Sequence, residues 1–147
     1  MWKIPKKKSR PGIDEYGRND LHYAALENKP KYVRRLIKKG VDINTLDDNG
    51  FSALHFAVQE NNKEIVKILL ESGVRVDVKD SYGNTPLMRA LHSCYAAMAN
   101  DEPDAGVIIR MLLKAGADPY SENNYGVKVI DRARDSAKDL MQFFDLG

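Results

Sequence analysis

The sequence predicts an all-α repeat protein, a solenoid of stacked turn-helix-turn-helix units with short β-turns. The first observation is a polar turn ending in glycine that recurs every 33 residues, at Gly17, Gly50 and Gly83. The second is a Leu-x-x-Ala segment that follows each turn, beginning at Leu21, Leu54 and Leu87. A third block, rich in leucine and closed by glycine, ends at Gly40, Gly73 and Gly116. A fixed period of this size is typical of repeats that stack into one continuous core and present a binding surface.

The period divides the chain into a short tail and four units. A fourth turn ends at Gly126, which is 43 rather than 33 residues after Gly83, and Gly116 likewise follows Gly73 by 43 residues. Ten extra residues therefore lie inside the third unit. The expected divisions are a basic flexible tail at 1–13, an N-terminal capping repeat at 14–46, a second repeat at 47–79, a third at 80–122 with an insertion at about 91–106, and a degenerate C-terminal cap at 123–147.

Residues 47–79 show how one unit is built. Asp47 to Gly50 has the composition of a tight turn, and Ser52 stands where a helix N-cap belongs. One apolar face of a short helix follows, and the stripe of a second helix runs from Ile65 to Leu70 before Gly73 ends it. Such short helices are marginal alone, so stacking on neighbouring units must bury their apolar faces.

The insertion has two parts with different compositions. Residues 91–99 are rich in alanine and predict a lengthened first helix. Residues 100–106 contain Asp101, Glu102, Asp104 and a proline, and they predict an acidic loop. Insertions in repeats often lie on a functional face, so these three acids are candidate contacts for a basic partner; a neutral surface excursion is the alternative.

These blocks resemble the ankyrin repeat over about residues 14–147. The family pattern of an acidic turn, Thr-Pro-Leu-His-x-Ala and Leu-Leu-x-x-Gly-Ala-Asp is matched by Thr85-Pro86-Leu87 and by Leu112 to Asp118. The match to the Thr-Pro start of this pattern is weaker in the first two units, and it is weaker still in the fourth, where Lys128-Val129 takes its place. The resemblance implies an ankyrin-type solenoid. It also implies that His22 and His55, 33 residues apart, tie each turn to the next by hydrogen bonds.

The sequence offers no recognisable catalytic or cofactor chemistry. It lacks a glycine-rich phosphate loop, a paired-histidine zinc motif and a Cys-x-x-Cys pair, so we expect no enzyme, no small-molecule substrate, no cofactor and no metal. Cys94 is interpreted as a buried or incidental thiol. With one cysteine, no apolar run of membrane length and no secretory signal, we expect a cytoplasmic protein that does not enter membranes.

Aromatic and arginine side chains at repeated positions are the candidate binding residues. Three turn tips carry tyrosine, and the position before the repeated alanine carries Tyr, Phe, Arg and Arg. The resemblance places both positions on the concave face, where ankyrin proteins typically bind partners. Packing against the neighbouring repeat is the alternative for some rings. The candidate contacts are Tyr16, Tyr23, Phe51, Phe56, Tyr82, Arg89, Tyr125 and Arg132.

The functional prediction is a monomeric, non-catalytic protein-binding module. If the chain is complete, it acts by occupying its partner, as a stoichiometric inhibitor such as a bacterial immunity or antitoxin protein. An adaptor that bridges two proteins is the alternative. Residues 1–40 carry a net charge of +8 and residues 41–147 one of −6. Nucleic-acid binding through this basic end therefore ranks third, with the candidate residues Lys6, Lys7, Lys8, Arg10, Lys31, Arg34, Arg35, Lys38 and Lys39.

Overall fold

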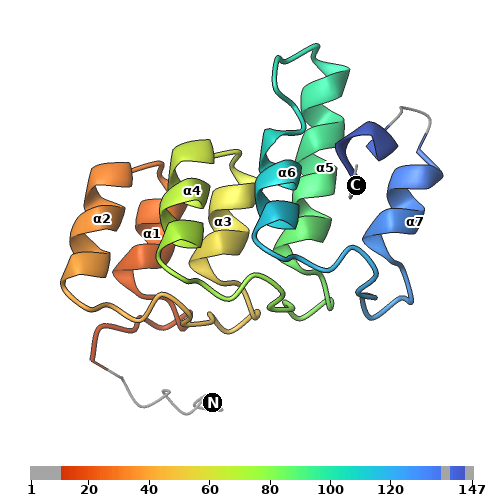
Figure 1. Cartoon of the computed structure of the whole chain (residues 1–147). Helices are drawn as coiled ribbons and strands as arrows, with labels where there is room; N and C mark the ends of the chain where they lie inside the picture. Colours follow the sequence, from red (N-terminus) through yellow and green to blue (C-terminus); the bar gives the residue numbers. More distant parts are fainter. Residues whose placement is uncertain (1–10, 137–139, 145–147) are drawn as a thin grey trace, which may run out of the picture.

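The computed structural model describes residues 11–136 and 140–144. These residues form an all-helical repeat solenoid, which confirms the predicted fold class (Figure 1). The elements are α1 (Asp20–Leu26), α2 (Pro30–Lys38), α3 (Ala53–Gln59), α4 (Lys63–Glu71), α5 (Pro86–Ala99), α6 (Val107–Lys114), α7 (Val129–Arg134) and a 3₁₀ helix, η1 (Leu140–Phe144).

The helices stand in two layers above a row of turns. The inner helices α1, α3 and α5 lie behind the outer helices α2, α4 and α6, α7 stands beside α5 at one end of the row, and the turns line the lower edge (Figure 1). One core runs through the stack, with Leu21, Leu54, Leu69, Leu87 and Leu112 at most 1% exposed. Each repeat therefore buries its apolar stripe against its neighbours.

The start of each inner helix follows from its cap. Ser52 accepts a hydrogen bond from the backbone N–H of His55, while the His55 ring accepts one from the N–H of Ser52, which is a capping box. Asn19 and His22 repeat this arrangement, and Thr85 caps α5 ahead of Pro86.

The turns are tied together by one backbone hydrogen bond at each step. The N–H of Asp48 donates to Tyr16, that of Ser81 to Asn49, and that of Asn124 to Tyr82. Gly50 shows why this row needs glycine: it has φ +76°, and an added Cβ would lie 2.9 Å from Asp80 Cα. Glycine at this position of the repeat therefore allows successive turns to stack closely.

The insertion lengthens one inner helix. At 14 residues, α5 is twice as long as α3, and the predicted helical extension at 91–99 is confirmed. Residues 100–106 form the expected loop before α6, and this tip stands above the rest of the solenoid in Figure 1.

The two ends differ from the central units. In the fourth unit, α7 has six residues, and η1 follows in place of a second α-helix. Of the tail predicted at 1–13, only residues 11–13 are described, so Lys6, Lys7, Lys8 and Arg10 lie outside the described residues. Within the described part of the chain, no helix is long and apolar enough to cross a membrane.

Candidate partner-binding surface

His22 and His55 hold the turns in place. The Nε2–H of His22 donates to the carbonyl of Phe51 at 2.9 Å, and that of His55 donates to the carbonyl of Asn84 at 3.0 Å. Both rings are at most 1% exposed, and burial lowers the pKa of each. The predicted link between successive repeats is therefore confirmed.

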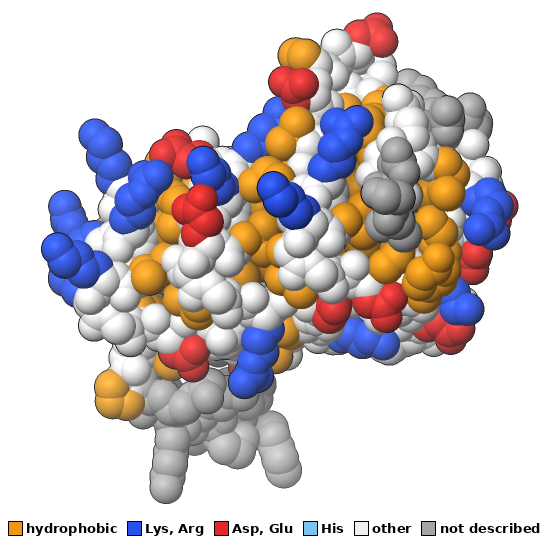
Figure 2. Space-filling model, in the orientation of Figure 1, with side chains coloured by type: hydrophobic (Ala, Val, Ile, Leu, Met, Phe, Trp, Pro, Cys, Tyr) orange, Lys and Arg blue, Asp and Glu red, His pale blue; other side chains and the backbone are white. Residues whose placement is uncertain are grey.

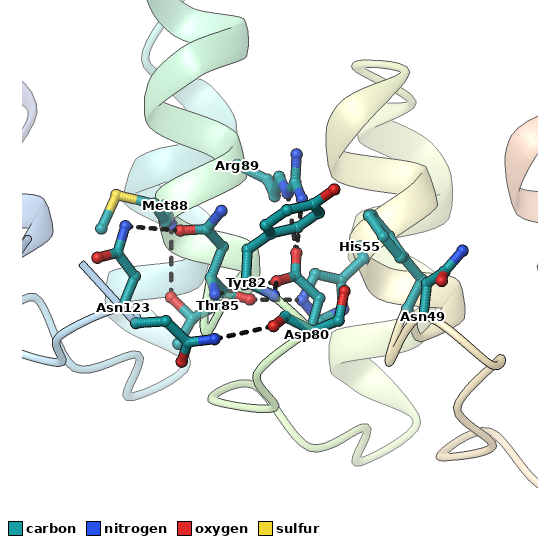
Figure 3. A network of polar contacts seen from close by, with 12 residues as sticks. Asn49, His55, Asp80, Tyr82, Thr85, Met88, Arg89 and Asn123 are labelled. Atoms are coloured by element: carbon teal, nitrogen blue, oxygen red, sulfur yellow. Dashed lines mark hydrogen bonds and ion pairs between the residues drawn. The ribbon is translucent and has the colours of Figure 1, made fainter.

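A buried aspartate organises each of the turns at Asp47 and Asp80. Oδ1 of Asp80 accepts the backbone N–H groups of Tyr82 and Asn84, at 2.9 and 3.1 Å. Its Oδ2 receives Arg89 from α5, with Nη2 at 2.7 Å and Nε at 3.1 Å, as Figure 3 shows. The first turn has a similar arrangement, in which the side chain nine residues after the turn aspartate donates to it. Here the Tyr23 hydroxyl donates to Asp14, and this hydrogen bond lowers the pKa of Asp14.

The second turn obtains its donor from the preceding repeat. Phe56 occupies the position of Tyr23 and Arg89 but has no polar group. Instead, Arg18 Nε lies 3.2 Å from Oδ2 of Asp47, whose carboxylate is 1% exposed. Two of the aligned turns therefore hold a guanidinium that already has a buried partner.

The expectation that Phe56 faces a partner is wrong. The ring is only 6% exposed, because it stacks on Phe51 and lies under the guanidinium of Arg18. Phe51 is half-buried between Phe56 and Arg89, and Tyr23 is half-buried. Phe51 and Phe56 thus join neighbouring repeats, which is the packing alternative, whereas Tyr23 contacts Asp14 and Arg18 of its own repeat.

The turn-tip tyrosines are exposed, as predicted. Tyr16, Tyr82 and Tyr125 have 56%, 52% and 74% of their surface accessible. Figure 3 shows Tyr82 beside the Arg89–Asp80 pair at the base of α5. Arg89 itself is 25% exposed at its side chain, so it offers a partner a guanidinium whose charge Asp80 has largely neutralised.

A groove of about 980 Å³ lies between α5 and α7, and we call it the α5–α7 groove. It exists where the repeat is least regular, because long α5 faces the six-residue α7. Its lining includes three predicted contacts, Arg89, Tyr125 and Arg132. The other lining residues are Asn84, Met88, Leu91, His92, Tyr95, Asn123, Val127, Asp135, Ser136 and Leu140.

Tyr95 and His92 are exposed contributors that the sequence reasoning missed. Tyr95 is 45% accessible and lines this groove, while His92 also lines a shallower hollow between the end of α3 and α5. The signal was available, since His92 and Tyr95 follow Arg89 at intervals of three on the predicted helical extension. Both residues lie beyond the repeated position, on the continuation of the same helix face into the insertion.

The insertion acids are all exposed, and their role as contacts stays a prediction. Glu102 lines the hollow beside α3, whereas Asp101 and Asp104 occupy left-handed positions in the loop, with φ 53° and 58°. The insertion residues that line the groove, Leu91, His92 and Tyr95, are thus on α5 rather than at the loop tip.

The basic end of the solenoid is a solvated outer surface. Lys and Arg side chains gather over α2 in Figure 2, where Lys31, Arg34, Arg35, Lys38 and Lys39 are exposed. Arg34 is paired with Glu64 of the next outer helix at 3.2 Å. Among the described residues, no three His, Cys, Asp or Glu side chains are grouped to hold a metal, and Cys94 is a buried thiol whose pKa burial raises.

Comparison with known proteins identifies the repeat. A family model of ankyrin repeats, in three copies, matches residues 21–123, which is well over half of the chain. The match runs from α1 into the fourth turn and so includes the extended α5. No curated protein matches the chain.

Proposed function

Since this chain belongs to the ankyrin repeat family, we propose that it binds one protein partner stoichiometrically across the α5–α7 groove and inhibits that partner by occupying its surface. Ankyrin repeats indicate a protein–protein interaction module, and the family is generally non-catalytic. A bacterial immunity or antitoxin protein is the form of inhibitor that we favour. An adaptor that bridges two partners is the alternative.

One observation carries the proposal. Tyr95 and Tyr125, 45% and 74% exposed, come from α5 and the fourth turn and line a single groove together with Arg132. Tyrosine and arginine are enriched where interfaces derive most of their binding energy. Both rings sit on ordered elements rather than long loops, so little entropy is lost when a partner docks.

The remaining features of the molecule support a binder without chemistry. Both buried histidines are committed to the turns, and Cys94 is enclosed in the core. A free buried thiol is typical of a reducing compartment, which supports a cytoplasmic site of action in this proposal. We further propose that the free protein is a monomer.

Capture of a partner followed by a functional assay tests the proposal. Immobilised wild-type protein should retain one protein from an extract of the source organism in a 1:1 complex. Tyr95→Ala combined with Tyr125→Ala should weaken that complex by at least about tenfold, since aromatic anchors commonly contribute more than 1 kcal/mol each. One equivalent of the wild-type protein should then abolish the activity of the purified partner.

Tyr120→Ala is the matched control. Tyr120 is 58% exposed and does not line the groove, so its loss should leave binding within about twofold of wild type. Equal binding by the double variant would refute the groove assignment. An unaltered partner activity in the 1:1 complex would refute inhibition and favour an adaptor.

A further inference from the structure

We propose that Arg132 in the α5–α7 groove binds a carboxylate of the partner, so that the groove selects a segment with an aspartate or glutamate side chain. This inference rests on the proposed function and names the chemistry that the groove recognises. It follows from a change at one turn position that leaves the guanidinium of Arg132 without the acid that its counterpart has.

The central units define the ordinary arrangement. Arg89 occupies the position of Arg132 in the third unit, and Asp80 of its own turn receives it through two hydrogen bonds. In the second unit, where Phe56 stands at that position, Arg18 supplies Asp47 with a donor instead. A buried turn carboxylate and a guanidinium therefore accompany one another in both units.

The fourth turn replaces the acid with Asn123. Oδ1 of Asn123 accepts the backbone N–H groups of Tyr125 and Val127, at 2.9 and 3.0 Å, as an aspartate would. Its Nδ2 donates to Oδ1 of Asn84 at 3.1 Å, as Figure 3 shows for the labelled Asn123. The amide thus preserves the turn but supplies no negative charge.

The side chain of Arg132 is exposed. No ion pair of Arg132 occurs within residues 11–136 and 140–144, whereas its neighbours Lys128 and Arg134 are paired with Glu122 and Asp131. The planar guanidinium matches a carboxylate in two parallel hydrogen bonds, and the Tyr95 and Tyr125 hydroxyls in the same lining can donate to that carboxylate as well.

Asp135 provides a test of whether the ligand of the groove is acidic or basic. It is exposed and is the one carboxylate among the described residues that line the groove. An acidic ligand would be repelled by Asp135 and a basic ligand attracted to it. Removal of this charge therefore strengthens binding of an acid and weakens binding of a base.

Selection from a displayed library of random 12-residue peptides tests the inference. The full-length wild-type protein should enrich peptides that carry Asp or Glu at one fixed position. For the best of these peptides, Arg132→Gln and Asn123→Asp should each weaken binding by about tenfold, and Asp135→Asn should tighten it about two- to threefold. Asn123→Asp is the sharpest variant, because it offers Arg132 the contact that Asp80 gives Arg89.

Arg134→Gln is the matched control. Arg134 lies on the same helix, 63% exposed at its side chain, and does not line the groove, so the variant should bind within about twofold of wild type. Circular dichroism of each variant should match wild type. Peptides without an enriched acid, acidic peptides that bind Arg132→Gln unchanged, or no selected peptide at all would each overturn the carboxylate assignment. The partner-capture experiment with the Tyr95 and Tyr125 variants judges the proposed function separately.

Discussion

Replacing Arg89 with alanine should destabilise the protein by about 2–4 kcal/mol, whereas the same change at Arg132 should cost less than about 0.5 kcal/mol. Arg89 makes two hydrogen bonds to a carboxylate that is 0% exposed, so its loss leaves the Asp80 oxygen buried without a donor. The 25% exposure of the Arg89 side chain keeps the estimate below that of a fully buried pair. Arg132 has no such acid, because Asn123 stands in its turn.

Urea unfolding followed by circular dichroism measures both variants under one set of conditions. With a slope of about 2 kcal/mol per molar urea, Arg89→Ala should lower the midpoint by about 1–2 M and Arg132→Ala by less than about 0.3 M. Equal midpoint losses would refute the distinction between Arg89, paired with the buried Asp80, and Arg132, whose own turn carries Asn123. An unchanged midpoint for Arg89→Ala would show that the Asp80 carboxylate is not held as described. A loss of partner binding in Arg89→Ala must therefore be corrected for stability before it is assigned to contact.

Two further predictions concern the row of turns. Because burial lowers the folded-state pKa of His22 and His55 while the unfolded value stays near 6.5, the unfolded chain binds more protons. The free energy of unfolding should therefore be at its full value above about pH 7. Below pH 6.5 it should fall by up to about 1.4 kcal/mol per pH unit for each histidine. Urea midpoints between pH 7.5 and 5 should show this, and His55→Gln should have a smaller slope; an identical slope would contradict the assignment. Gly50→Ala should destabilise by about 1–3 kcal/mol more than Gly126→Ala, because both have positive φ but an added Cβ meets Asp80 only at Gly50, and equal thermal midpoints would contradict it.

Local chemistry made the fold readable from the sequence. Ser52 and Thr85 cap their helices by accepting a hydrogen bond from the backbone three residues later. Gly50 ends its turn with a backbone of positive φ, which glycine adopts readily. The histidine links followed from the resemblance. Each of these features depends on residues that are close in sequence or one repeat apart, so the 33-residue period carries the information.

The binding surface was less readable, because neighbours decide what a repeated position does. Tyr23, Phe56 and Arg89 share one position, but Phe56 is buried by Phe51 and by Arg18 from the preceding unit. No property of Phe56 alone predicts this. The groove was also hidden, since it depends on how α5 and α7 face one another, which neither helix determines alone.

The difference between Arg132 and Arg89, by contrast, can be read from the sequences of the turns. The first residue of each turn reads Asp14, Asp47 and Asp80, and then Asn123. An asparagine conserves the two backbone bonds that the turn requires and removes only the charge. Repeat matching selects both Arg89 and Arg132 as candidates, and the change from Asp80 to Asn123 distinguishes the two.

The two irregularities of this solenoid meet at the same surface. The insertion extends α5, and the degenerate fourth unit faces it with a short α7 and a neutral turn. The exposed ring of Tyr95 lines the groove beside Leu91 and Leu140, whose side chains are buried in the core. A partner that fills the groove, as we propose, would contact both α5 and the fourth unit, and it would stabilise the folded state to which it binds.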